Sequence, residues 1–262
     1  MSDLIARFRS LHESGCFVIP NPWDVGSARL LVQLGFPALA TTSAGFAWSI
    51  GRRDNHGSLE QALQHFRDIR SAVDVPLSAD FEGAFAITPD DVAVNVEAAT
   101  TTGVAGLSLE DSTGDTSNPL FDFALAVDRV RAARASTDVV LTARCEAYLV
   151  GCPDLAETIR RLTAYAEAGA DCLYAPGMRD VGQIKSVVDA LAPKAVNVLA
   201  GSDFTTVAEL QSLGVRRISV GGALARAAWT GFLDAAQEIA ERGTFTGLAR
   251  AVPFATLNRR FE

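Results

Sequence analysis

The stretch VPLSADFEGAFAITPDDV, residues 75–92, begins with a short apolar run, continues through two acidic residues and a glycine, and ends at a marked helix start. Thr88 can cap this helix, and Pro89 suits its first position because the N–H that proline lacks has no helical partner there. The stretch therefore predicts a strand, then a loop that carries Asp80 and Glu82, then a helix.

The same pair of elements, an apolar run and a helical pattern, recurs along the chain. The runs of strand length are CFVIP, PALAT, PLSA, GLSL, VVLTA, CLYA, VNVLA and RISV. Ser58, Asp154 and Thr206 are each followed three residues later by Gln or Glu, which is typical of a capping box at a helix start. Strands that alternate with helices imply parallel pairing through right-handed crossovers. Eight such units in 262 residues fit a (β/α)8 barrel, which needs ~250 residues, better than an open doubly wound sheet.

We therefore predict an α/β fold with a single (β/α)8 TIM-type barrel over residues 1–243. The opening segment MSDLIARFRSLHES has apolar residues at helical spacing and predicts an extra N-terminal helix. Residues 244–262 follow the eighth helix and are expected to form a helical C-terminal tail. No Pro/Ser-rich linker or low-complexity segment divides the chain further.

The composition argues against several classes of function. A formal charge of −8 and a pI near 5.0 disfavour a nucleic-acid-binding protein, which needs a basic face. No apolar run approaches the ~20 residues of a membrane span, and the N-terminus lacks the apolar core of a signal peptide. The four cysteines are scattered without a CxxC pair, which favours a reduced, cytoplasmic protein.

Lys185 and Lys194 are the only lysines, and neither follows a strand, so an imine mechanism is disfavoured.

Residues that follow the strands of such a barrel meet at one mouth, where barrel enzymes carry out their chemistry. The side chains expected there include Asp24, Thr42, Ser43, Ala44, Asp80, Glu82, Glu110, Asp111, Arg144, Glu146 and Tyr174. Carboxylates this close repel one another unless a positive charge lies among them. A hard divalent cation with oxygen ligands, Mg²⁺ or Mn²⁺, meets that need, whereas zinc is disfavoured because the chain has three histidines and no ligand pair. The alternative is that these acids cap helices or pair with arginines.

Four other features admit two interpretations each. The pair Gly221-Gly222 could cradle a phosphate with backbone N–H groups or serve for close packing at the rim. His56 could act as a general base or be a bystander in a polar loop. Tyr174 could orient a substrate or pack in the core. Cys145 alternates to the side of the strand opposite Arg144, so a core position is favoured over a nucleophile.

The order and spacing of four motifs, GRRD, ADFEG, AGLSLED and LTARCEA, resemble the isocitrate lyase/phosphoenolpyruvate mutase superfamily. The resemblance extends over most of the chain, from NPWDVGSARLLVQLGF to RRISVGGALARAA. It implies a Mg²⁺-assisted enzyme that makes or breaks a C–C or P–C bond next to a 2-oxo or 2-hydroxy acid.

The resemblance also implies roles for individual residues. Asp80 is similar to the principal metal-site aspartate of the family, Glu110 to the glutamate after the fourth strand, and Asp54 to the acid after the second-strand loop. Arg144 resembles the arginine that clamps a substrate carboxylate, and residues 42–44 resemble the segment that holds a carboxylate or oxyanion. The expected catalytic residues are Arg144, Asp54 and Ser43, the expected substrate contacts are Thr42, Ser43, Ala44, Arg144, Tyr174 and Asn118, and the expected metal ligands are Asp80, Glu110, Asp54 and Glu82.

Two departures from the family pattern narrow the expected activity. Many members have Asp-x-Asp at the end of the third strand, whereas this chain has Ser78 at the first of these positions, and Glu82 is the candidate for the missing charge. The segment after Glu110 lacks the Lys-Lys-Cys-Gly-His loop that supplies a cysteine acid in the isocitrate and methylisocitrate lyases. Asn118 lies eight residues after Glu110, where the phosphonate-cleaving branch also carries an asparagine. Isocitrate lyase itself is therefore disfavoured.

We predict a Mg²⁺-dependent lyase that cleaves a C–C bond next to a small 2-oxo or 2-hydroxy carboxylic acid through an enolate-like intermediate. Two alternatives stay open: a phosphonopyruvate-type P–C bond hydrolase or mutase, and a barrel that binds an acidic metabolite without turning it over. The apolar tail, together with the exchange of C-terminal helices in the superfamily, predicts a homo-oligomer, specifically a tetramer.

Overall fold

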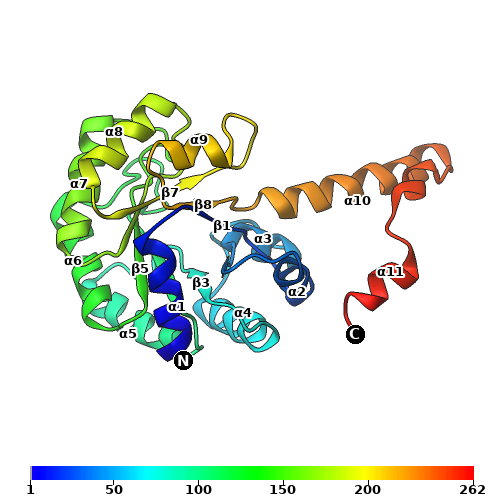
Figure 1. Cartoon of the computed structure of the whole chain (residues 1–262), viewed down its shortest axis with the longest axis horizontal. Helices are drawn as coiled ribbons and strands as arrows, with labels where there is room; N and C mark the ends of the chain where they lie inside the picture. The colour runs from blue at the N-terminus through cyan, green and yellow to red at the C-terminus, as the bar shows by residue number, and fades with distance from the viewer. Residues whose placement is uncertain (1) are drawn as a thin grey trace.

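The computed structural model describes residues 2–262, and in this part of the chain eight parallel strands form one sheet that curls into a barrel (Figure 1). The strands are β1 (Phe17–Ile19), β2 (Leu39–Ala40), β3 (Leu77–Asp80), β4 (Gly106–Glu110), β5 (Val140–Arg144), β6 (Cys172–Tyr174), β7 (Ala195–Leu199) and β8 (Arg217–Ser219). Each overlaps one of the predicted apolar runs, although β3, β4, β5 and β7 extend one residue beyond theirs. The predicted barrel is confirmed.

Helices follow or precede the strands as the sequence indicates, and α1 is the predicted N-terminal helix. The helices are α1 (Ser2–Glu13), α2 (Val25–Gln33), α3 (Ser43–Ser49), α4 (Leu59–Ala72), α5 (Pro89–Thr100), α6 (Phe123–Ala135), α7 (Leu155–Glu167), α8 (Val181–Leu191), α9 (Val207–Ser212), α10 (Ala223–Arg242), the short 3₁₀ helix η1 (Thr246–Arg250) and α11 (Phe254–Arg259). At the start of α4, Ser58 and Gln61 form the reciprocal capping box. At the starts of α7 and α9, Asp154 and Thr206 each accept a backbone N–H, as capping residues do.

One buried side chain, that of Asn21, helps to close the barrel. The strand order is β1-β8-β7-β6-β5-β4-β3-β2, so β1 and β2 are the two edges that must meet. Asn21 follows β1; its Nδ2 donates to the carbonyl of Thr41 after β2 at 2.9 Å, and its Oδ1 accepts the N–H groups of Val220 and Gly221 after β8 at 2.9 and 2.8 Å. A single amide therefore ties three strand ends together at the rim that carries the site.

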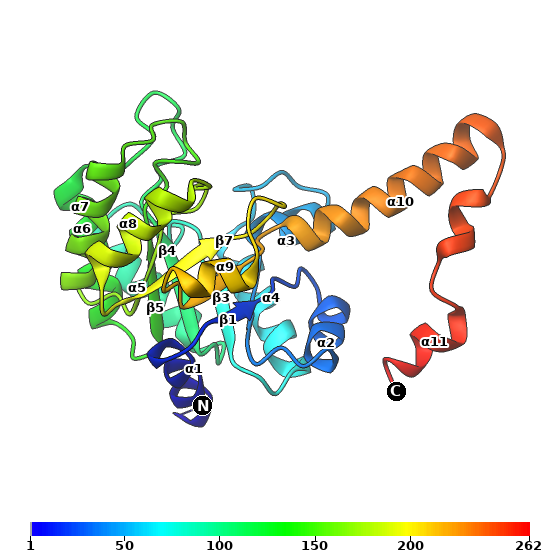
Figure 2. The same ribbon diagram turned by 45° about the horizontal axis from the view of Figure 1, so that its top comes forward.

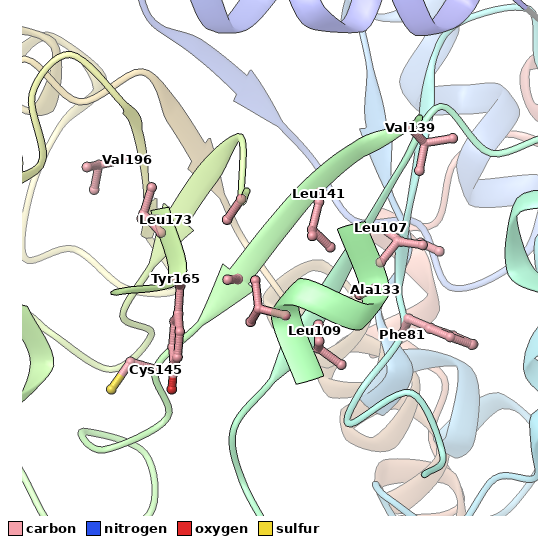
Figure 3. Packing of buried hydrophobic residues seen from close by; sticks show 14 of the residues in the cluster. Phe81, Leu107, Leu109, Ala133, Val139, Leu141, Cys145, Tyr165, Leu173 and Val196 are labelled. Carbon is pink, nitrogen blue, oxygen red and sulfur yellow. The ribbon is translucent and has the colours of Figure 1, made fainter. Parts of the chain in front are cut away.

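The main core lies between the sheet and the surrounding helices, where Leu107, Leu141 and Phe81 are fully buried (Figure 3). A second cluster lies at the N-terminal end of the barrel, under α1. Phe8 of α1 is 0% exposed there and packs edge-to-face on Phe17, with ring centroids 6.4 Å apart. A Cβ at Gly106 would lie 2.6 Å from the Phe8 ring, so glycine is needed for this approach. Burial of one such ring contributes about 1.5–3 kcal/mol, which explains how α1 stays in place over the barrel floor.

The C-terminal part of the chain leaves the barrel. Helix α10 points away from it, and the chain then turns and returns through η1 and α11 (Figures 1 and 2). The return ends beside α2, where the guanidinium of Arg29 lies 5.9 Å from the ring centre of Phe261. The departure therefore begins within α10, before the expected boundary at Gly243. Among residues 2–262, no helix, α10 included, is both long enough and apolar enough to cross a bilayer.

Candidate active site

The site lies at the C-terminal mouth of the barrel, around a cavity of about 170 Å³. This volume is well below the ~300–1,000 Å³ of pockets for drug-sized ligands, so the cavity suits a small molecule. The cavity is lined by the predicted residues Thr42, Ser43, Ala44, Asp54, Asp80, Arg144 and Tyr174. A wider groove of about 1210 Å³ adjoins it at Asp54 and is lined by Glu82 and Glu110. The structure thus brings these nine predicted residues together at one mouth.

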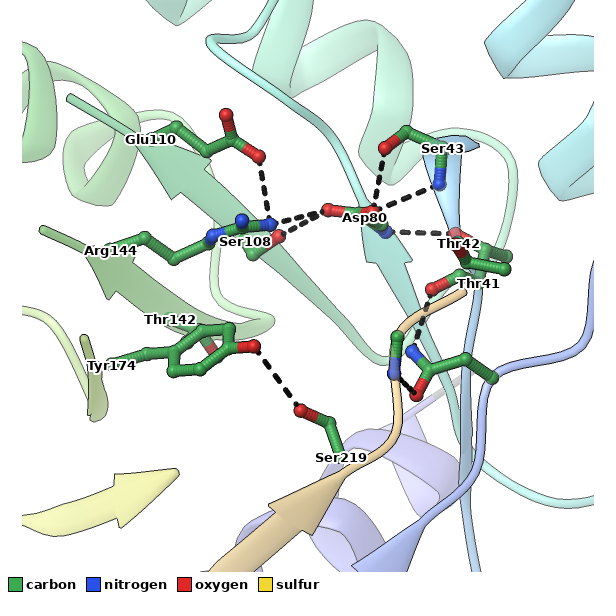
Figure 4. A network of polar contacts seen from close by, with 12 residues as sticks. Thr41, Thr42, Ser43, Asp80, Ser108, Glu110, Thr142, Arg144, Tyr174 and Ser219 are labelled. Carbon is green, nitrogen blue, oxygen red and sulfur yellow. Dashed lines mark hydrogen bonds and ion pairs between the residues drawn. The ribbon is translucent and has the colours of Figure 1, made fainter. Parts of the chain in front are cut away.

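Asp80, the last residue of β3, is the most highly coordinated carboxylate of the site (Figure 4). Its Oδ2 accepts the backbone N–H and the hydroxyl of Ser43, each at 2.9 Å. Its Oδ1 accepts Nη1 of Arg144 at 2.9 Å and the hydroxyl of Ser108 at 3.3 Å. The backbone N–H of Asp80 donates to Oγ1 of Thr41 at 2.8 Å. Asp80 therefore has a fixed position between β2, β4 and β5.

Arg144, the last residue of β5, lies among three carboxylates. Nη1 contacts Asp80 at 2.9 Å and Glu110 at 2.8 Å, and Nε contacts Glu146 at 2.7 Å. Burial alone would lower the pKa of Arg144, but the three carboxylates raise that pKa well above its usual value, so the guanidinium stays charged. Its second terminal nitrogen, Nη2, has no partner among residues 2–262 and is available to a ligand.

The remaining acids of the mouth carry raised pKa values. Burial, followed by repulsion from Asp80 and Asp54, raises the pKa of Glu82 to about 7. The pKa of Asp54 is raised by burial first and then by Asp80. Burial also raises the pKa of Glu110 well above its usual value, although Arg144 opposes this shift. Each of these acids is therefore difficult to ionise in this partly desolvated space, and a cation bound among them would stabilise the charged forms.

The acidic loop after β3 is held from beneath by a buried arginine that the sequence analysis did not identify. Arg129 of α6 is 1% exposed; it donates to the carbonyls of Ala86 at 2.5 Å, Ile87 at 2.8 Å and Gly83 at 2.8 Å. These bonds hold a segment in which Glu82, φ 49°, and two other non-glycine residues have left-handed backbone conformations. Such conformations persist only where the surroundings impose them, so Arg129 helps to fix the position of Glu82.

A second buried network fixes the opposite side of the site. Asp111, directly after β4, is 3% exposed; its Oδ1 accepts the backbone N–H of Glu146 at 2.8 Å. Its Oδ2 accepts the hydroxyl of Tyr165 at 2.6 Å and Nη1 of Arg161 at 3.2 Å. Glu146 is thereby held where it can bind Nε of Arg144. No sequence motif indicated this network, because its members lie up to 54 positions apart.

The structure also places Asn118 and three of the features that admitted two interpretations. Asn118 lies in the exposed loop between Asp111 and α6 and lines neither the cavity nor the groove. His56 is exposed and bonded to Nη2 of Arg53 at 2.7 Å. The N–H of Gly221 is already donated to Asn21, which removes one donor from a phosphate cradle. Cys145 is 0% exposed within the core, as predicted.

The donor set has the chemistry that a hard divalent cation requires, since Asp80, Glu82, Glu110 and Asp54 supply only carboxylate oxygens. However, no group of three or more His, Cys, Asp or Glu side chains within residues 2–262 is arranged closely enough to hold a metal ion. Arg144 lies between Asp80 and Glu110 and occupies the centre of the acidic cluster. The residues therefore fit Mg²⁺ as it is usually bound, by one or two carboxylates together with waters and substrate.

A sequence comparison identifies the family to which this site belongs. Residues 8–240, most of the barrel and α10, match the phosphoenolpyruvate phosphomutase family. The chain belongs to this family. The match confirms the resemblance that the motifs around Asp80, Glu110 and Arg144 indicated.

Several other proteins resemble the chain over almost its whole length. A structure of a candidate lyase/mutase from Burkholderia cenocepacia J2315 is 46% identical, with a TM-score of 0.96, and the match covers 99% of this chain and 96% of that one. Oxaloacetate decarboxylase of Pseudomonas aeruginosa is 29% identical over 92% of this chain and 86% of its own length. Oxaloacetate acetylhydrolase, solved with its product oxalate, is 28% identical with a TM-score of 0.86, over 98% and 93% of the two chains.

Proposed function

We propose that the protein is a Mg²⁺-dependent lyase that cleaves a C–C bond next to a small 2-oxo or 2-hydroxy carboxylic acid. The observation that carries the proposal is the position of Arg144 beside a small cavity, paired with Asp80, Glu110 and Glu146. Two relatives, the oxaloacetate decarboxylase and the oxaloacetate acetylhydrolase, bear the name of one 2-oxo dicarboxylic acid. Oxaloacetate is therefore the first substrate to test.

Asp80 is the residue expected to contact the cation directly, and Glu82, Glu110 and Asp54 are expected to act through bound waters. When bound, Mg²⁺ would polarise the C2 carbonyl and stabilise the negative charge that develops on its oxygen. Asp80 is suited to this position because Ser43 and Ser108 hold its carboxylate rigidly at the mouth. Glu82 and Asp54 add negative charge that Arg144 does not pair with in the structure.

Arg144 is expected to bind the substrate carboxylate. Its Nε donates to Glu146, its Nη1 donates to Asp80 and forms an ion pair with Glu110, and these contacts orient the guanidinium plane. The two N–H groups of Nη2 are left to donate to a carboxylate in the cavity. Lysine could not take this role, because one ammonium group cannot maintain three carboxylate contacts in a plane and still present a pair of donors.

The segment at the start of α3 completes the binding surface. Thr42, Ser43 and Ala44 line the cavity on the side facing Arg144, and Thr42 caps the helix by accepting the N–H of Gly45. The backbone N–H and hydroxyl of Ser43 both donate to Asp80, so Ser43 acts in the structure by positioning that carboxylate. A ligand carboxylate seated between α3 and Arg144 would place C2 near Asp80.

The test is turnover of oxaloacetate by the purified chain, with product analysis by NMR. Cleavage is expected with added Mg²⁺ and should stop with EDTA, and the products distinguish decarboxylation, which gives pyruvate, from hydrolysis, which gives oxalate and acetate. A panel of other 2-oxo and 2-hydroxy acids, together with phosphonopyruvate, defines the substrate class. Turnover of phosphonopyruvate alone would instead favour P–C cleavage. A folded protein that converts none of these compounds with Mg²⁺ would contradict the proposal.

A further inference from the structure

The interior of the barrel contains a buried arginine, Arg217, that has no acidic partner. Arg217 begins β8, is 5% exposed, and forms no ion pair with any group in residues 2–262. Its Nε donates to Oδ1 of Asn197 at 2.8 Å, and Nη2 donates to the hydroxyl of Thr142 at 3.0 Å. Nη1 faces Nε2 of His12, which reaches into the barrel from α1, at 3.3 Å. Burial of a charge with only neutral partners costs folding free energy, so the presence of Arg217 at this position requires an explanation.

His12 accepts a hydrogen bond from Arg217 rather than donating one. Its Nδ1 lies 2.7 Å from the carbonyl of Phe8, which can only accept, so the ring proton is on Nδ1 and Nε2 is an acceptor. Burial and the neighbouring Arg217 lower the pKa of His12 to about 3, so the ring is neutral at physiological pH. Arg217 is thus fixed in the barrel by three acceptors, and each N–H that it donates has a defined direction.

From Arg217 a series of hydrogen bonds leads along the lining of the active-site cavity to Tyr174. A guanidinium only donates, so Asn197 presents its oxygen to Arg217 and its NH₂ group to Ser219, whose Oγ lies 2.9 Å from Nδ2. Ser219 accepts that bond and directs its own proton to the hydroxyl oxygen of Tyr174 at 3.4 Å (Figure 4). No other acceptor for the Ser219 proton is found in residues 2–262. Every link therefore donates towards Tyr174, and Arg217, Asn197 and Ser219 line the same cavity as Tyr174 does.

Tyr174 is the end of this chain and lines the cavity with Asp80 and Arg144. When its oxygen accepts from Ser219, its own proton is unused, because Ser219 is the only polar partner of the Tyr174 hydroxyl among residues 2–262. Burial raises the pKa of Tyr174 to about 12, so the hydroxyl keeps its proton at neutral pH. The ring also lies against Arg144, whose guanidinium carbon is 5.1 Å from the ring centre, which holds the hydroxyl in a fixed place.

We propose that Arg217, Asn197 and Ser219 are positioning residues that set the direction of a hydrogen-bond chain, so that Tyr174 donates its hydroxyl proton to an anionic oxygen of the ligand. This inference rests on the proposed function, because that function supplies a ligand with anionic oxygens next to Arg144. The buried charge of Arg217 makes the direction permanent, since an arginine cannot become an acceptor at any physiological pH. Donors fixed before the reaction are the means by which enzymes stabilise developing oxyanions.

The variant that tests the direction is Asn197→Asp. A carboxylate of the same shape accepts from Arg217 as before, but it cannot donate to Ser219. Ser219 then donates to the new carboxylate and accepts from Tyr174, whose proton is no longer available to the ligand. The fold is expected to survive, because the variant gives Arg217 an acidic partner, and thermal unfolding monitored by circular dichroism checks this.

The measurement is the affinity for oxalate, an analogue of a 2-oxo acid enolate, by calorimetry in the presence of Mg²⁺. Asn197→Asp and Tyr174→Phe should each weaken oxalate binding roughly tenfold or more, the value of a hydrogen bond to a charged group. The double variant should bind no more weakly than Tyr174→Phe alone. Ser219→Ala added to Asn197→Asp should restore binding, because Tyr174 then has no serine to which it can donate.

Three results would overturn the proposal or its basis, and they are distinguishable. If Asn197→Asp binds oxalate with wild-type affinity, the direction of the hydrogen-bond chain has no effect on ligand binding. Asn197→Asp could also weaken oxalate binding by the same factor in the Tyr174→Phe background as in the wild type. That result would show a general effect of the added charge and would also overturn the proposal. If the wild-type protein does not bind oxalate with Mg²⁺, the proposed function itself is contradicted. The proposed contact between Tyr174 and an anionic ligand then has no basis.

Discussion

The side chains of Arg144 and Glu146, two residues apart at the end of β5, form an ion pair in which Nε donates to Oε1 at 2.7 Å. Glu146 is only 3% exposed, and its backbone N–H is held by Asp111. The pair therefore joins the mouth of the barrel to the buried network behind it. Because Nε is bound from this side, the terminal nitrogens of Arg144 are directed towards Asp80, Glu110 and the cavity.

Glu146→Gln should weaken substrate binding more than it slows the chemical step. Glutamine keeps the shape of the side chain but not its charge, so Arg144 is held less firmly in the plane that receives a carboxylate. We expect KM for the accepted 2-oxo acid to rise about fivefold, which corresponds to ~1 kcal/mol, with a smaller change in kcat. Asp189→Asn, which removes the exposed pair of Lys185 and Asp189, is the matched control. Equal effects of the two variants would contradict the assigned role of Glu146.

Asp80→Ala should abolish activity while the fold survives. The substitution removes the acceptor of four hydrogen bonds at the mouth, but Arg144 keeps Glu110 and Glu146 as partners, so no buried charge is left uncompensated. Calorimetry with Mg²⁺, turnover assays and circular dichroism on the same preparation separate loss of the metal from loss of the fold. Full Mg²⁺-dependent turnover in this variant would show that the metal is held elsewhere.

Affinity for Mg²⁺ should rise with pH between about pH 6 and pH 8. Burial, with Asp80 and Asp54 adding to it, raises the pKa of Glu82 to about 7, so Glu82 is neutral below that value and charged above it. Because the folded state holds this proton more tightly than the unfolded state, Glu82 also contributes less to stability as the pH rises through the window from its ordinary pKa to about 7. In Glu82→Gln the dependence of Mg²⁺ affinity on pH should be shallower. Identical pH profiles for the two proteins would exclude Glu82.

Cys145→Ser and Cys172→Ser should retain the chemistry. Both side chains are 0% exposed, and burial raises the pKa of each thiol, so neither can act as a thiolate at neutral pH. The exposed Cys152, replaced by serine, is the control for surface effects. A loss in kcat beyond about a hundredfold in a folded variant, the size expected for a missing general acid, would show that a cysteine takes part.

The parts of the structure that the sequence could predict depend on local pattern. The strand runs, the cap at Ser58 and the acids after β3 and β4 follow from periodicity and from residues a few positions apart. The roles of Arg129 and Arg217 could not be predicted in this way, because their hydrogen-bond partners lie between 20 and 205 positions away in the sequence. In addition, an arginine in an amphipathic pattern is normally predicted to be a surface residue. The direction of α10 was not predictable either. An apolar stripe indicates that a helix packs against another surface, but it does not identify that surface.

The arm formed by α10, η1 and α11 exposes a large apolar surface. Phe232 and Leu233 of α10 are 58% and 57% exposed, and Phe254 of α11 is 81% exposed. The turn between the helices is nevertheless well defined, because Glu238 accepts the N–H of Gly247 at 2.6 Å and that of Thr246 at 2.9 Å. An ordered arm with apolar side chains on the outside is the form expected of an interface between subunits.

We propose that the protein is a homo-oligomer, specifically a tetramer, and that residues after Gly243 help to form it. Burial of several exposed side chains of this size at about 25 cal/mol per Å² contributes several kcal/mol, which is favourable enough to offset part of the entropy lost on association. Sedimentation should show an oligomer for the intact chain and a smaller species for a chain that ends at Gly243. Phe254→Glu should shift the intact chain in the same direction, whereas Val207→Glu, at a barrel position that is 49% exposed, should not. A monomeric intact chain would refute the oligomer, and an unchanged oligomer after truncation would refute the role of the tail.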